Sequence, residues 1–375
     1  MMKQRLVGRY QKSSGKFLIW IESAVIFAPD QLPIINHQKG CLQMYKAAEK
    51  RYDGVQVRHA GDTGLMLPPI SLGLWRHFGS RDPLRERREV ILKAFDKGVF
   101  HFDLANNYGN DGADFGSTES LFGEIIKQDL GPYRNELVIS SKAGYEIHDG
   151  PFGIGTSRKS LLQGIDDSLR RMNLDYVDIY YAHRYDDRTP IAETVKALDD
   201  IVRQGKALYV GVSNYEKPQL QEAIALFKEL KTPFVLDQMS ANMLKNEPEE
   251  TGLLQVLQDA GAGLIAYGPL AEGLLSERYL QGIPDTVALH RTNKDLLDQG
   301  KEVLVQKLND LNNVASQRGQ TLSQLALAWL LKDPVVTSVI IGTTSVEHLE
   351  DNLKAAENLT FNGGEIAAIE GILAR

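Results

Sequence analysis

The 375-residue sequence contains a single cysteine, Cys41. One thiol cannot form an intramolecular disulfide, and it cannot supply a cysteine-based zinc site or an iron–sulfur cluster. The fold must therefore rest on buried apolar side chains, for which a chain of this length with 43% hydrophobic residues is sufficient. The shortage of cysteine also indicates a reducing compartment, and we expect a cytoplasmic location.

No apolar run is long enough to cross a membrane. The longest, Phe17–Ala28, has 12 residues and includes Glu22, whereas a membrane-spanning helix needs about 20 mostly apolar residues. We therefore expect no membrane insertion. Basic residues precede this run, so a weak targeting peptide is one interpretation of the start of the chain.

The N-terminal segment differs in composition from the rest. Residues 1–43 hold six basic and two acidic residues, while the remaining 332 residues hold 36 and 47. We therefore expect residues 1–50 to be an extension, either disordered or read from an upstream start. Residues 51–375 are expected to form a single domain, because no linker-like segment interrupts them.

Basic clusters and several well-known motifs are also missing. Acidic residues outnumber basic ones by 49 to 42, and without a Lys/Arg cluster a nucleic-acid partner is not expected. The sequence has no G-x-G-x-x-G after a strand, no G-x-x-x-x-G-K-[ST], no G-x-S-x-G and no H-E-x-x-H. These absences argue against Rossmann, P-loop, serine-hydrolase and zincin chemistry, and leave a small neutral or anionic ligand as the expected partner.

Short β-like runs alternate evenly with helical patterns from about residue 70 onward. The eight runs, most of them rich in Val, Ile, Leu and Tyr as strands buried on both faces should be, are Ser71–Leu74, Phe100–Asp103, Leu137–Lys142, Tyr176–Tyr181, Ala207–Val212, Phe234–Gln238, Gly263–Tyr267 and Thr337–Ile341. Eight such alternations in roughly 290 residues favour an α/β fold of the (β/α)₈ TIM-barrel type over an open sheet.

Three segments fall outside this alternation. Val55–Pro69 has Gly61-Asp62 at its centre and predicts a hairpin that plugs the bottom of the barrel. After the seventh strand, about 30 residues separate Tyr267 from the next helical pattern near Leu296, and loops of that length are usually functional. Residues Gly364–Leu373 predict an extra C-terminal helix that covers part of the barrel mouth.

Polar residues follow the second, third and fourth strand runs, where a barrel of this type places its active site. Asp103 and Lys142 end two of the runs, His183 follows a third, and Tyr108 lies five residues after Asp103. A phenol, whose pKa is ordinarily about 10, needs a nearby cation to become a useful acid. Lys142 can be that cation, with Asp103 compensating its burial and His183 positioning a substrate oxygen. Each residue alone has a structural explanation, but their joint position favours catalysis.

The sequence around these residues resembles the aldo-keto reductase superfamily. The resemblance runs from about residue 53 to the C-terminus and rests on Phe102-Asp103-Leu104-Ala105-Asn106-Asn107-Tyr108-Gly109, on Lys142 in Ser-Ser-Lys-Ala, and on His183 after Asp-Ile-Tyr-Tyr-Ala. Within the superfamily, Leu72-Gly73-Leu74-Trp75, Lys142-Ala143-Gly144-Tyr145 and Lys206-Ala207-Leu208-Tyr209-Val210-Gly211 are most similar to the bacterial L-glyceraldehyde 3-phosphate reductases, which are related to the potassium channel β-subunits.

The resemblance implies a carbonyl reductase that uses NADP(H), with NAD(H) as the alternative, and needs no metal. Tyr108 would be the general acid, tuned by Lys142 and Asp103, and His183 would orient the carbonyl. The residues expected to hold the cofactor are Trp75, Ser213, Asn214, Gln238, Tyr267, Gly268, Pro269, Leu270, Gly273, Arg278, Gly342, Thr343, Thr344, His348, Asp351 and Asn352. The expected substrate pocket consists of Trp75, Tyr108, Tyr145, His183 and Arg184, although Arg184 could instead pair with Asp186 or Asp187.

The chain departs from this pattern at two positions. Relatives often carry arginine where this sequence has Ser345 and Ala288, and those arginines help to hold the cofactor phosphates. His348 is a weaker anion partner than arginine because its imidazole is mostly neutral. The preference for NADP over NAD is therefore less firmly implied than hydride transfer itself.

Two other functions stay open at this point. One is a regulatory or redox-sensing protein that keeps a nicotinamide cofactor bound and turns over slowly, as the resemblance to channel β-subunits suggests. The other is a metal-dependent barrel lyase or hydrolase, which a chelator would inactivate. The expected substrates of the reductase are small aldehydes and ketoaldehydes such as L-glyceraldehyde 3-phosphate and methylglyoxal, and the resemblance also implies a homo-oligomer, a tetramer or octamer.

Overall fold

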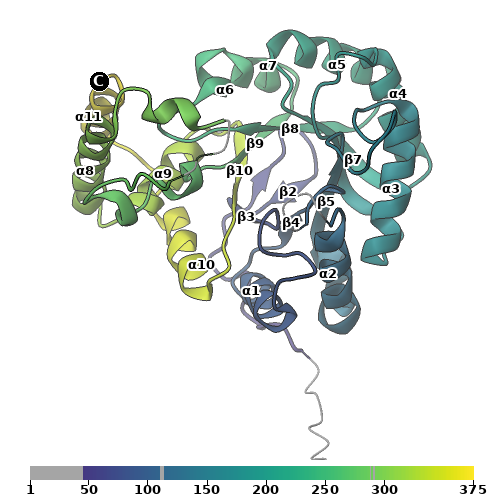
Figure 1. Ribbon diagram of the computed structural model, residues 1–375, viewed down its shortest axis with the longest axis horizontal. Helices are drawn as coiled ribbons and strands as arrows, with labels where there is room; N and C mark the ends of the chain where they lie inside the picture. Colours follow the sequence, from purple (N-terminus) through teal and green to yellow (C-terminus); the bar gives the residue numbers. More distant parts are fainter. Residues whose placement is uncertain (1–44, 110–113, 288, 290–291) are drawn as a thin grey trace, which may run out of the picture. The chain divides into compact units, whose positions relative to one another are not determined.

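The computed structural model describes residues 45–109, 114–287, 289 and 292–375. Within these residues eight parallel strands close into a barrel in the order β10-β3-β4-β5-β6-β7-β8-β9 (Figure 1). Their bounds are Ile70–Gly73 (β3), His101–Asp103 (β4), Val138–Ala143 (β5), Val177–Ala182 (β6), Ala207–Ser213 (β7), Phe234–Ser240 (β8), Gly263–Tyr267 (β9) and Val336–Ile341 (β10). Each coincides with a predicted run to within two residues at either end, so the (β/α)₈ prediction is confirmed.

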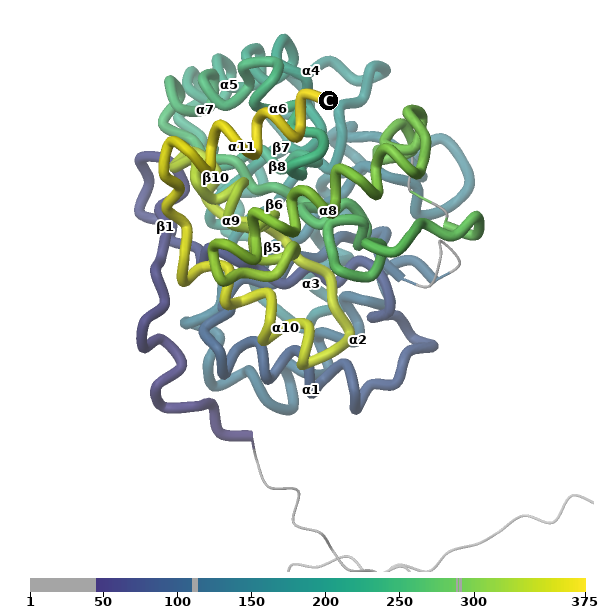
Figure 2. The backbone as a smooth tube through the Cα atoms, turned by 90° about the vertical axis from the view of Figure 1, so that its left-hand side faces the viewer, coloured from purple at the N-terminus to yellow at the C-terminus, as the bar shows by residue number. Residues whose placement is uncertain are grey.

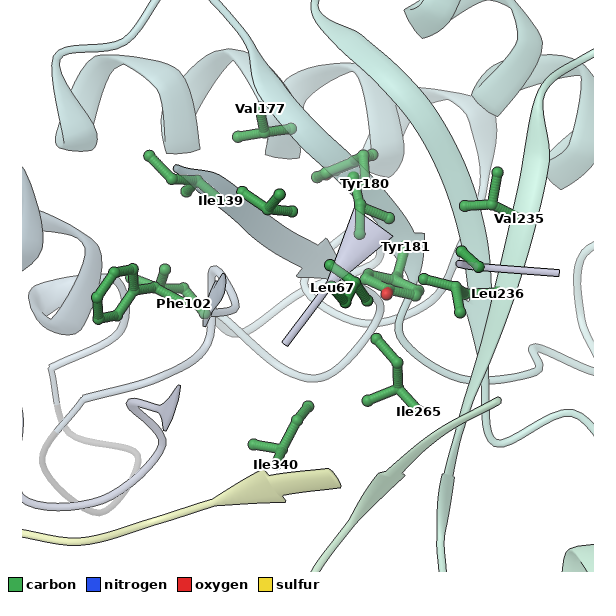
Figure 3. Packing of buried hydrophobic residues seen from close by; sticks show 14 of the residues in the cluster. Leu67, Phe102, Ile139, Val177, Tyr180, Tyr181, Val235, Leu236, Ile265 and Ile340 are labelled. Atoms are coloured by element: carbon green, nitrogen blue, oxygen red, sulfur yellow. The ribbon is translucent and has the colours of Figure 1, made fainter. Parts of the chain in front are cut away.

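The strands form because their side chains are buried on both faces, inside the barrel and under the helices. Val339 pairs with Ile70, which joins the last strand to the first and leaves no open sheet edge. The interior is filled by side chains such as Tyr181, Leu236 and Ile265 (Figure 3). The barrel is therefore a packed core, and the chemistry must lie at its ends.

Helices cover the outside of the barrel. Those that follow the strands in turn are Leu84–Asp96 (α1), Ser117–Ile125 (α2), Arg158–Met172 (α3), Ile191–Arg203 (α4), Lys217–Leu230 (α5), Glu247–Glu250 (α6), Leu253–Asp259 (α7), Leu322–Leu331 (α9) and Val346–Leu353 (α10). A π-helical turn, Ile126–Leu130, and a 3₁₀ turn, Gly131–Glu136, continue α2. Helices α1 and α10, which lie far apart in the sequence, are side by side because the barrel closes (Figure 2).

The predicted hairpin is present and lies at the N-terminal ends of the strands. Its strands are Arg58–His59 (β1) and Met66–Leu67 (β2), paired antiparallel. The Asp62 amide donates to the Gly261 carbonyl just before β9, and a Cβ at Gly61 would lie 2.0 Å from that carbonyl oxygen. Leu67 is fully buried in the same hydrophobic cluster as the barrel strands (Figure 3). The hairpin thus seals the bottom of the barrel, as predicted.

The segment after β9 builds a second hydrophobic cluster beside the barrel. Three 3₁₀ turns, Ala271–Gly273, Glu277–Tyr279 and Lys294–Leu297, precede the long helix α8, Lys301–Gln317. The extra C-terminal helix exists as α11, Gly363–Leu373, but it packs on α8 and buries Ile369 in this cluster (Figure 1). The prediction that it covers the barrel mouth is wrong, because it packs against α8.

The described chain begins with a segment that packs against the barrel. The Tyr45 hydroxyl donates to the Asp96 carboxylate over 2.7 Å, and Ala47 is buried. Cys41 and the rest of residues 1–44 lie outside the described residues, so the predicted division into residues 1–50 and 51–375 stays a prediction. None of the described helices is both long and apolar enough to span a bilayer.

A layer of polar side chains interrupts the apolar interior near β4. His101, the first residue of that strand, is fully buried and contacts two serine hydroxyls. Burial lowers the pKa of this imidazole to about 4, although the Asp103 charge opposes the shift. His101 is therefore a neutral group in the folded barrel at physiological pH.

This burial predicts a loss of stability in acid. An unfolded histidine binds a proton near pH 6.5, whereas His101 in the barrel does so only near pH 4. Between these values the unfolded chain binds more protons, so stability falls as the pH falls, by about 3 kcal/mol in total from this residue. We expect chemical denaturation of His101→Gln to show a smaller decrease from pH 6.5 to pH 4 than the native chain; equal decreases would contradict the assignment.

Candidate active site

Four predicted side chains meet at the C-terminal ends of three neighbouring strands. Asp103 ends β4, Lys142 is the penultimate residue of β5, and His183 directly follows β6. Tyr108 lies in the loop between β4 and α2, with the Lys142 ammonium nitrogen 3.2 Å from its hydroxyl oxygen. Parallel neighbours bring these groups together because their register is fixed by the barrel.

Lys142 is fully buried, and each of its three N–H groups has an acceptor. They donate to Asp103 Oδ2 over 2.5 Å, to the Leu104 carbonyl over 2.7 Å and to the Tyr108 hydroxyl over 3.2 Å. Burial lowers the pKa of Lys142, and the Asp103 carboxylate opposes that shift. A buried cation held by three acceptors is fixed in direction, and one of its hydrogens points at Tyr108.

Asp103 is anchored on its other oxygen. Its Oδ1 accepts hydrogen bonds from the Ser140 hydroxyl over 2.7 Å and from the Gln238 amide over 3.0 Å. The carboxylate therefore keeps Oδ2 toward Lys142. The sequence predicts that Gln238 contacts a cofactor. The structure shows that its amide donates to Asp103 and so helps to orient the ion pair.

The pKa of Tyr108 is raised and not lowered, although the Lys142 ammonium lies beside its hydroxyl. Burial raises the pKa of its phenol well above 10, and the charges of Asp103, Tyr267 and Tyr145 add to the shift. The phenol is thus protonated over the physiological range and can act as an acid. The Lys142 hydrogen bond then matters when the proton leaves, because it stabilises the phenolate that forms.

His183 lies between two aromatic rings in this site. The Tyr145 ring packs edge-on against it at 4.6 Å between centroids, and the Tyr108 ring lies at 5.8 Å. Burial, followed by the charges of Lys142 and Arg184, lowers the pKa of His183 well below 6.5. Its neutral imidazole can donate a hydrogen bond to a carbonyl oxygen without bringing a second positive charge.

A cavity of about 1120 Å³ opens over these residues. The predicted site residues that line it are Trp75, Asp103, Tyr108, Tyr145, His183, Asn214, Gln238, Tyr267, Gly268, Pro269, Leu270, Gly273, Arg278, Gly342, Thr343, Thr344, His348, Asp351 and Asn352. Of the described residues predicted here, Lys142, Ser213 and Arg184 do not line it. Lys142 lies beneath Tyr108, and the Arg184 guanidinium lies over the Tyr145 ring at 5.5 Å.

Ser213 supports the cavity from behind. Its hydroxyl donates to the Gln238 carbonyl over 2.7 Å and accepts from the Asn214 amide over 3.0 Å. Asn214 adopts a left-handed backbone with φ of 57° and also accepts from the Tyr267 hydroxyl over 2.7 Å. This network holds an amide and an aromatic ring at the cavity wall, which suits a flat, polar ring such as a carboxamide-bearing heterocycle.

The far part of the cavity suits phosphate groups. Gly342, Thr343 and Thr344 line it immediately before α10, whose N-cap is Ser345. The segment 268–273, which follows the neighbouring strand β9 and also lines the cavity, contains four residues with positive φ. Left-handed backbone in such a loop and a helix N-terminus both direct N–H groups toward an anion. Arg278 and His348 also line the cavity, whereas Ala288 lies outside the described residues.

These features make the cavity fit a nicotinamide dinucleotide. Its volume is adequate, and its walls carry amide, aromatic and phosphate-directed groups. Among its described lining residues, two buried side-chain atoms have no hydrogen-bond partner. These are Nδ1 of His183 and Oδ1 of Asn107, which both belong to cavity-lining residues. No cluster of His, Cys, Asp and Glu side chains suited to a metal ion occurs among the described residues.

Several cavity residues were not predicted from the sequence. Arg76 lies 3.9 Å from Glu272, which also accepts a hydrogen bond from Asn293 over 3.1 Å. Glu272 has a left-handed backbone with φ of 58°. A glutamate in a sequence does not indicate this conformation, so its position could not be predicted. Arg76, by contrast, directly follows Trp75 and could have been found by extending the motif by one position.

Comparison with known proteins agrees with this geometry. The profile of the Aldo/keto reductase family matches residues 69–374. The chain is 46% identical over 331 residues to L-glyceraldehyde 3-phosphate reductase of Escherichia coli K12, covering 87% of this chain and 95% of that protein. It is 35% identical over 312 residues to a probable voltage-gated potassium channel subunit beta of Arabidopsis thaliana, covering 81% and 92%.

Solved structures show the same similarity. A thermostable aldo-keto reductase in complex with the inhibitor epalrestat superimposes with a TM-score of 0.66 at 32% identity, covering 84% of this chain and 99% of that one. An aldo-keto reductase of Bacillus halodurans in its holo form gives a TM-score of 0.69 at 22% identity over 85% and 96%, a likeness that speaks for the fold alone.

The ion pair beneath the cavity predicts a large stability effect. Lys142→Met leaves the buried Asp103 carboxylate without its cation, and breaking such a pair costs about 3 to 5 kcal/mol. Replacing both residues, as in Lys142→Met with Asp103→Leu, should recover part of that loss, because no unpaired buried charge remains, although Ser140 and Gln238 lose their shared acceptor. Urea denaturation measures both.

Lys196 provides the matched control. Its ammonium pairs with Asp199 and Asp200 while 48% of its side chain stays exposed. Without Lys196, the buried Asp199 carboxylate still accepts hydrogen bonds from Arg203 and Thr232. Lys196→Met should therefore destabilise the fold far less than Lys142→Met. Equal losses for the two lysines would show that Lys142 is not held by a buried ion pair.

Proposed function

Because this chain belongs to the aldo/keto reductase family and is an oxidoreductase, we propose that it reduces small aldehydes and ketoaldehydes to alcohols with NADPH, using Tyr108 as the general acid. The observation that carries the proposal is the hydrogen-bonded series from Asp103 through Lys142 to Tyr108, which ends at the wall of a large cavity beside a neutral His183. A phenol, a cation and a carbonyl-orienting group are the parts that carbonyl reduction requires.

The nicotinamide cofactor, when bound, supplies a hydride to the carbonyl carbon. In the proposed site Asn214 and Gln238 would hold its carboxamide, with Ser213 orienting both from behind, and Tyr267 would stack on its ring. The segments 268–273 and 342–344 would hold its phosphates, and His348, Asp351 and Asn352 would hold its adenosine end. Trp75, Arg278 and the other loop residues that line the cavity would surround the bound cofactor.

Tyr108 delivers the proton in this proposal. As negative charge develops on the carbonyl oxygen, the phenol transfers its hydrogen to that oxygen and becomes a phenolate. Lys142 already donates to the phenol oxygen, so the phenolate forms beside a cation in a site of low polarity, where that interaction is strong. Asp103 keeps Lys142 charged and correctly directed.

His183 and Tyr145 position the substrate. The neutral imidazole donates to the carbonyl oxygen, and the Tyr145 ring fixes the imidazole plane by packing against it edge-on. Trp75 forms another part of the proposed pocket. Arg184 is the proposed partner of an anionic group on the substrate. Its guanidinium does not line the cavity itself and lies over the Tyr145 ring, which does.

The substrate class is supported by similarity. The relative from Escherichia coli is named L-glyceraldehyde 3-phosphate reductase, and the match covers nearly all of both chains. We therefore propose L-glyceraldehyde 3-phosphate and the related ketoaldehyde methylglyoxal as substrates. A cytoplasmic homo-oligomer, a tetramer or octamer, is part of the same proposal and rests on the resemblance.

A second function is favoured by the similarity to probable channel β-subunits. The chain would then retain its cofactor and act as a redox-sensing or regulatory protein with slow turnover. Rapid, saturable oxidation of NADPH by methylglyoxal supports the reductase. Cofactor that co-purifies with the protein while turnover stays negligible supports the sensor.

Tyr108→Phe tests the acid. Loss of a general acid lowers turnover by about 10² to 10⁴-fold, while NADPH binding, followed by its fluorescence, should hardly change because the ring remains. Tyr209→Phe, on a β7 residue away from the cavity, is the control and should react like the native protein. Normal turnover of Tyr108→Phe would remove Tyr108 from its role.

Ser345→Arg tests the cofactor preference. An arginine at the start of α10 should strengthen NADPH binding over NADH by about tenfold or more, as expected for a hydrogen bond between charged groups. Ser345→Ala loses the same N-cap, whose hydroxyl accepts from the His348 amide, without adding charge. The ratio of the NADPH and NADH dissociation constants is measured for both variants. If both change this ratio equally, the side chain at position 345 does not contact the phosphate that distinguishes NADPH from NADH.

A further inference from the structure

A row of buried polar side chains runs from Asp103 across neighbouring strands to β10. Ser140 Oγ lies 2.7 Å from Asp103 Oδ1, and His101 Nε2 lies 3.1 Å from Ser140 Oγ. On its other side His101 Nδ1 lies 2.8 Å from Ser71 Oγ, which lies 2.6 Å from Ser338 Oγ. All four side chains are fully buried and come from the adjacent strands β5, β4, β3 and β10.

The Asp103 carboxylate at one end of the row and the neutral His101 ring in its middle together fix which atom donates in each hydrogen bond. The Asp103 carboxylate, paired with Lys142, can only accept, so Ser140 must use its single hydrogen to donate to it. Ser140 then has only lone pairs to offer His101, so the ring nitrogen Nε2 must carry the proton.

The remaining bonds follow from a neutral ring. With Nε2 protonated, Nδ1 has no hydrogen and accepts one from Ser71. The Ser71 hydroxyl then accepts in turn from Ser338 over 2.6 Å. The Pro69 carbonyl competes for the same hydrogen from 3.2 Å, but it already accepts from the Val339 amide. Burial holds the pKa of His101 at about 4, which keeps this assignment intact at neutral pH. Every hydrogen in the row therefore points toward Asp103.

This arrangement is unusual for a barrel interior. Such layers are ordinarily filled by Val, Ile and Leu, and each buried hydroxyl or imidazole costs free energy unless it is paired. Here every polar atom is paired, and the row ends on the carboxylate that directs Lys142. Hydrogen bonds that share one direction polarise one another, so the last donor becomes stronger.

We propose that His101 is a positioning residue for the reduction: by donating to Ser140 it strengthens the Ser140–Asp103 bond and so holds Asp103 Oδ2 toward Lys142. This inference rests on the proposed function of Tyr108 and Lys142. His101 touches neither cavity nor reacting atoms, so its effect falls on the rate of the chemical step and leaves substrate and cofactor binding unchanged.

The proton position is tested first, in the native protein. Long-range proton–nitrogen correlation spectra of the histidine rings, with the His101 signals identified by their absence in His101→Gln, report which nitrogen carries the hydrogen. Between about pH 5.5 and pH 8 we expect a neutral ring protonated on Nε2, since its pKa is about 4. A ring protonated on Nδ1 would overturn the proposal.

Substitutions test the consequence. His101→Leu and His101→Asn, whose amide is too short to reach Ser140, should lower kcat about tenfold with little change in KM or in the NADPH dissociation constant. His101→Gln can still donate to Ser140 and should keep most of the rate. If all three variants retain native kcat, or if Gln is no better than Leu and Asn, His101 serves the fold alone.

A double-mutant cycle separates direct from independent effects. Ser140→Ala should lower kcat about tenfold, and Ser140→Ala with His101→Asn should lower it no further, because both changes break the same series. A hundredfold loss in the double variant would show that His101 does not act through Ser140. Tyr108→Phe, measured in parallel, identifies failure of the proposed function itself: if it turns over normally, Tyr108 is not the acid, whereas an inactive Tyr108→Phe beside unaffected His101 variants rejects only the positioning role.

Discussion

The site depends on one buried ion pair, Lys142 with Asp103. An ammonium group removed from water is tolerated only when its charge and its hydrogens are matched, and here three acceptors meet that condition. The pair could not form on a single loop, because its two members must be held at fixed positions without water. Closure of eight strands into a barrel provides that rigidity and brings β4 and β5 into register. In the proposed mechanism, the phenol of Tyr108 can serve as the acid because it lies at the end of this arrangement.

The position of the site follows from the same closure. Strands β4, β5 and β6 are neighbours in sequence and in space, so residues at their carboxyl ends converge without long connections. The other end of the barrel is sealed by the hairpin, and the segment between β9 and α8 supplies one wall of the cavity. Rigid groups from strands therefore do the proposed chemistry, while loops surround the bound molecules, a division that the barrel architecture favours.

The strands could be predicted from the sequence, and so could the four polar residues that meet at their ends, because both depend on local pattern. Runs rich in branched residues mark β5 and β6, and a charged residue after such a run marks a strand end. The rest depends on pairing between distant residues. Nothing in the sequence relates Ser338 to Ser71, since only closure of the barrel makes them neighbours. The Glu272 contact needs left-handed backbone at a residue that rarely adopts it. The position of α11 was predicted wrongly because the apolar residues of a helix do not indicate which surface of the protein they pack against.

The hairpin at the base of the barrel meets β9 through backbone atoms. Gly61 and Gly261 both have positive φ, and any side chain at Gly61 would collide with the neighbouring carbonyl. Apolar positions such as Leu67 can exchange one hydrophobic side chain for another of similar volume at modest cost. The two glycines have no such equivalents. The close approach of two peptide groups therefore limits amino-acid substitution at this end of the barrel more than the packing of the hydrophobic hairpin does.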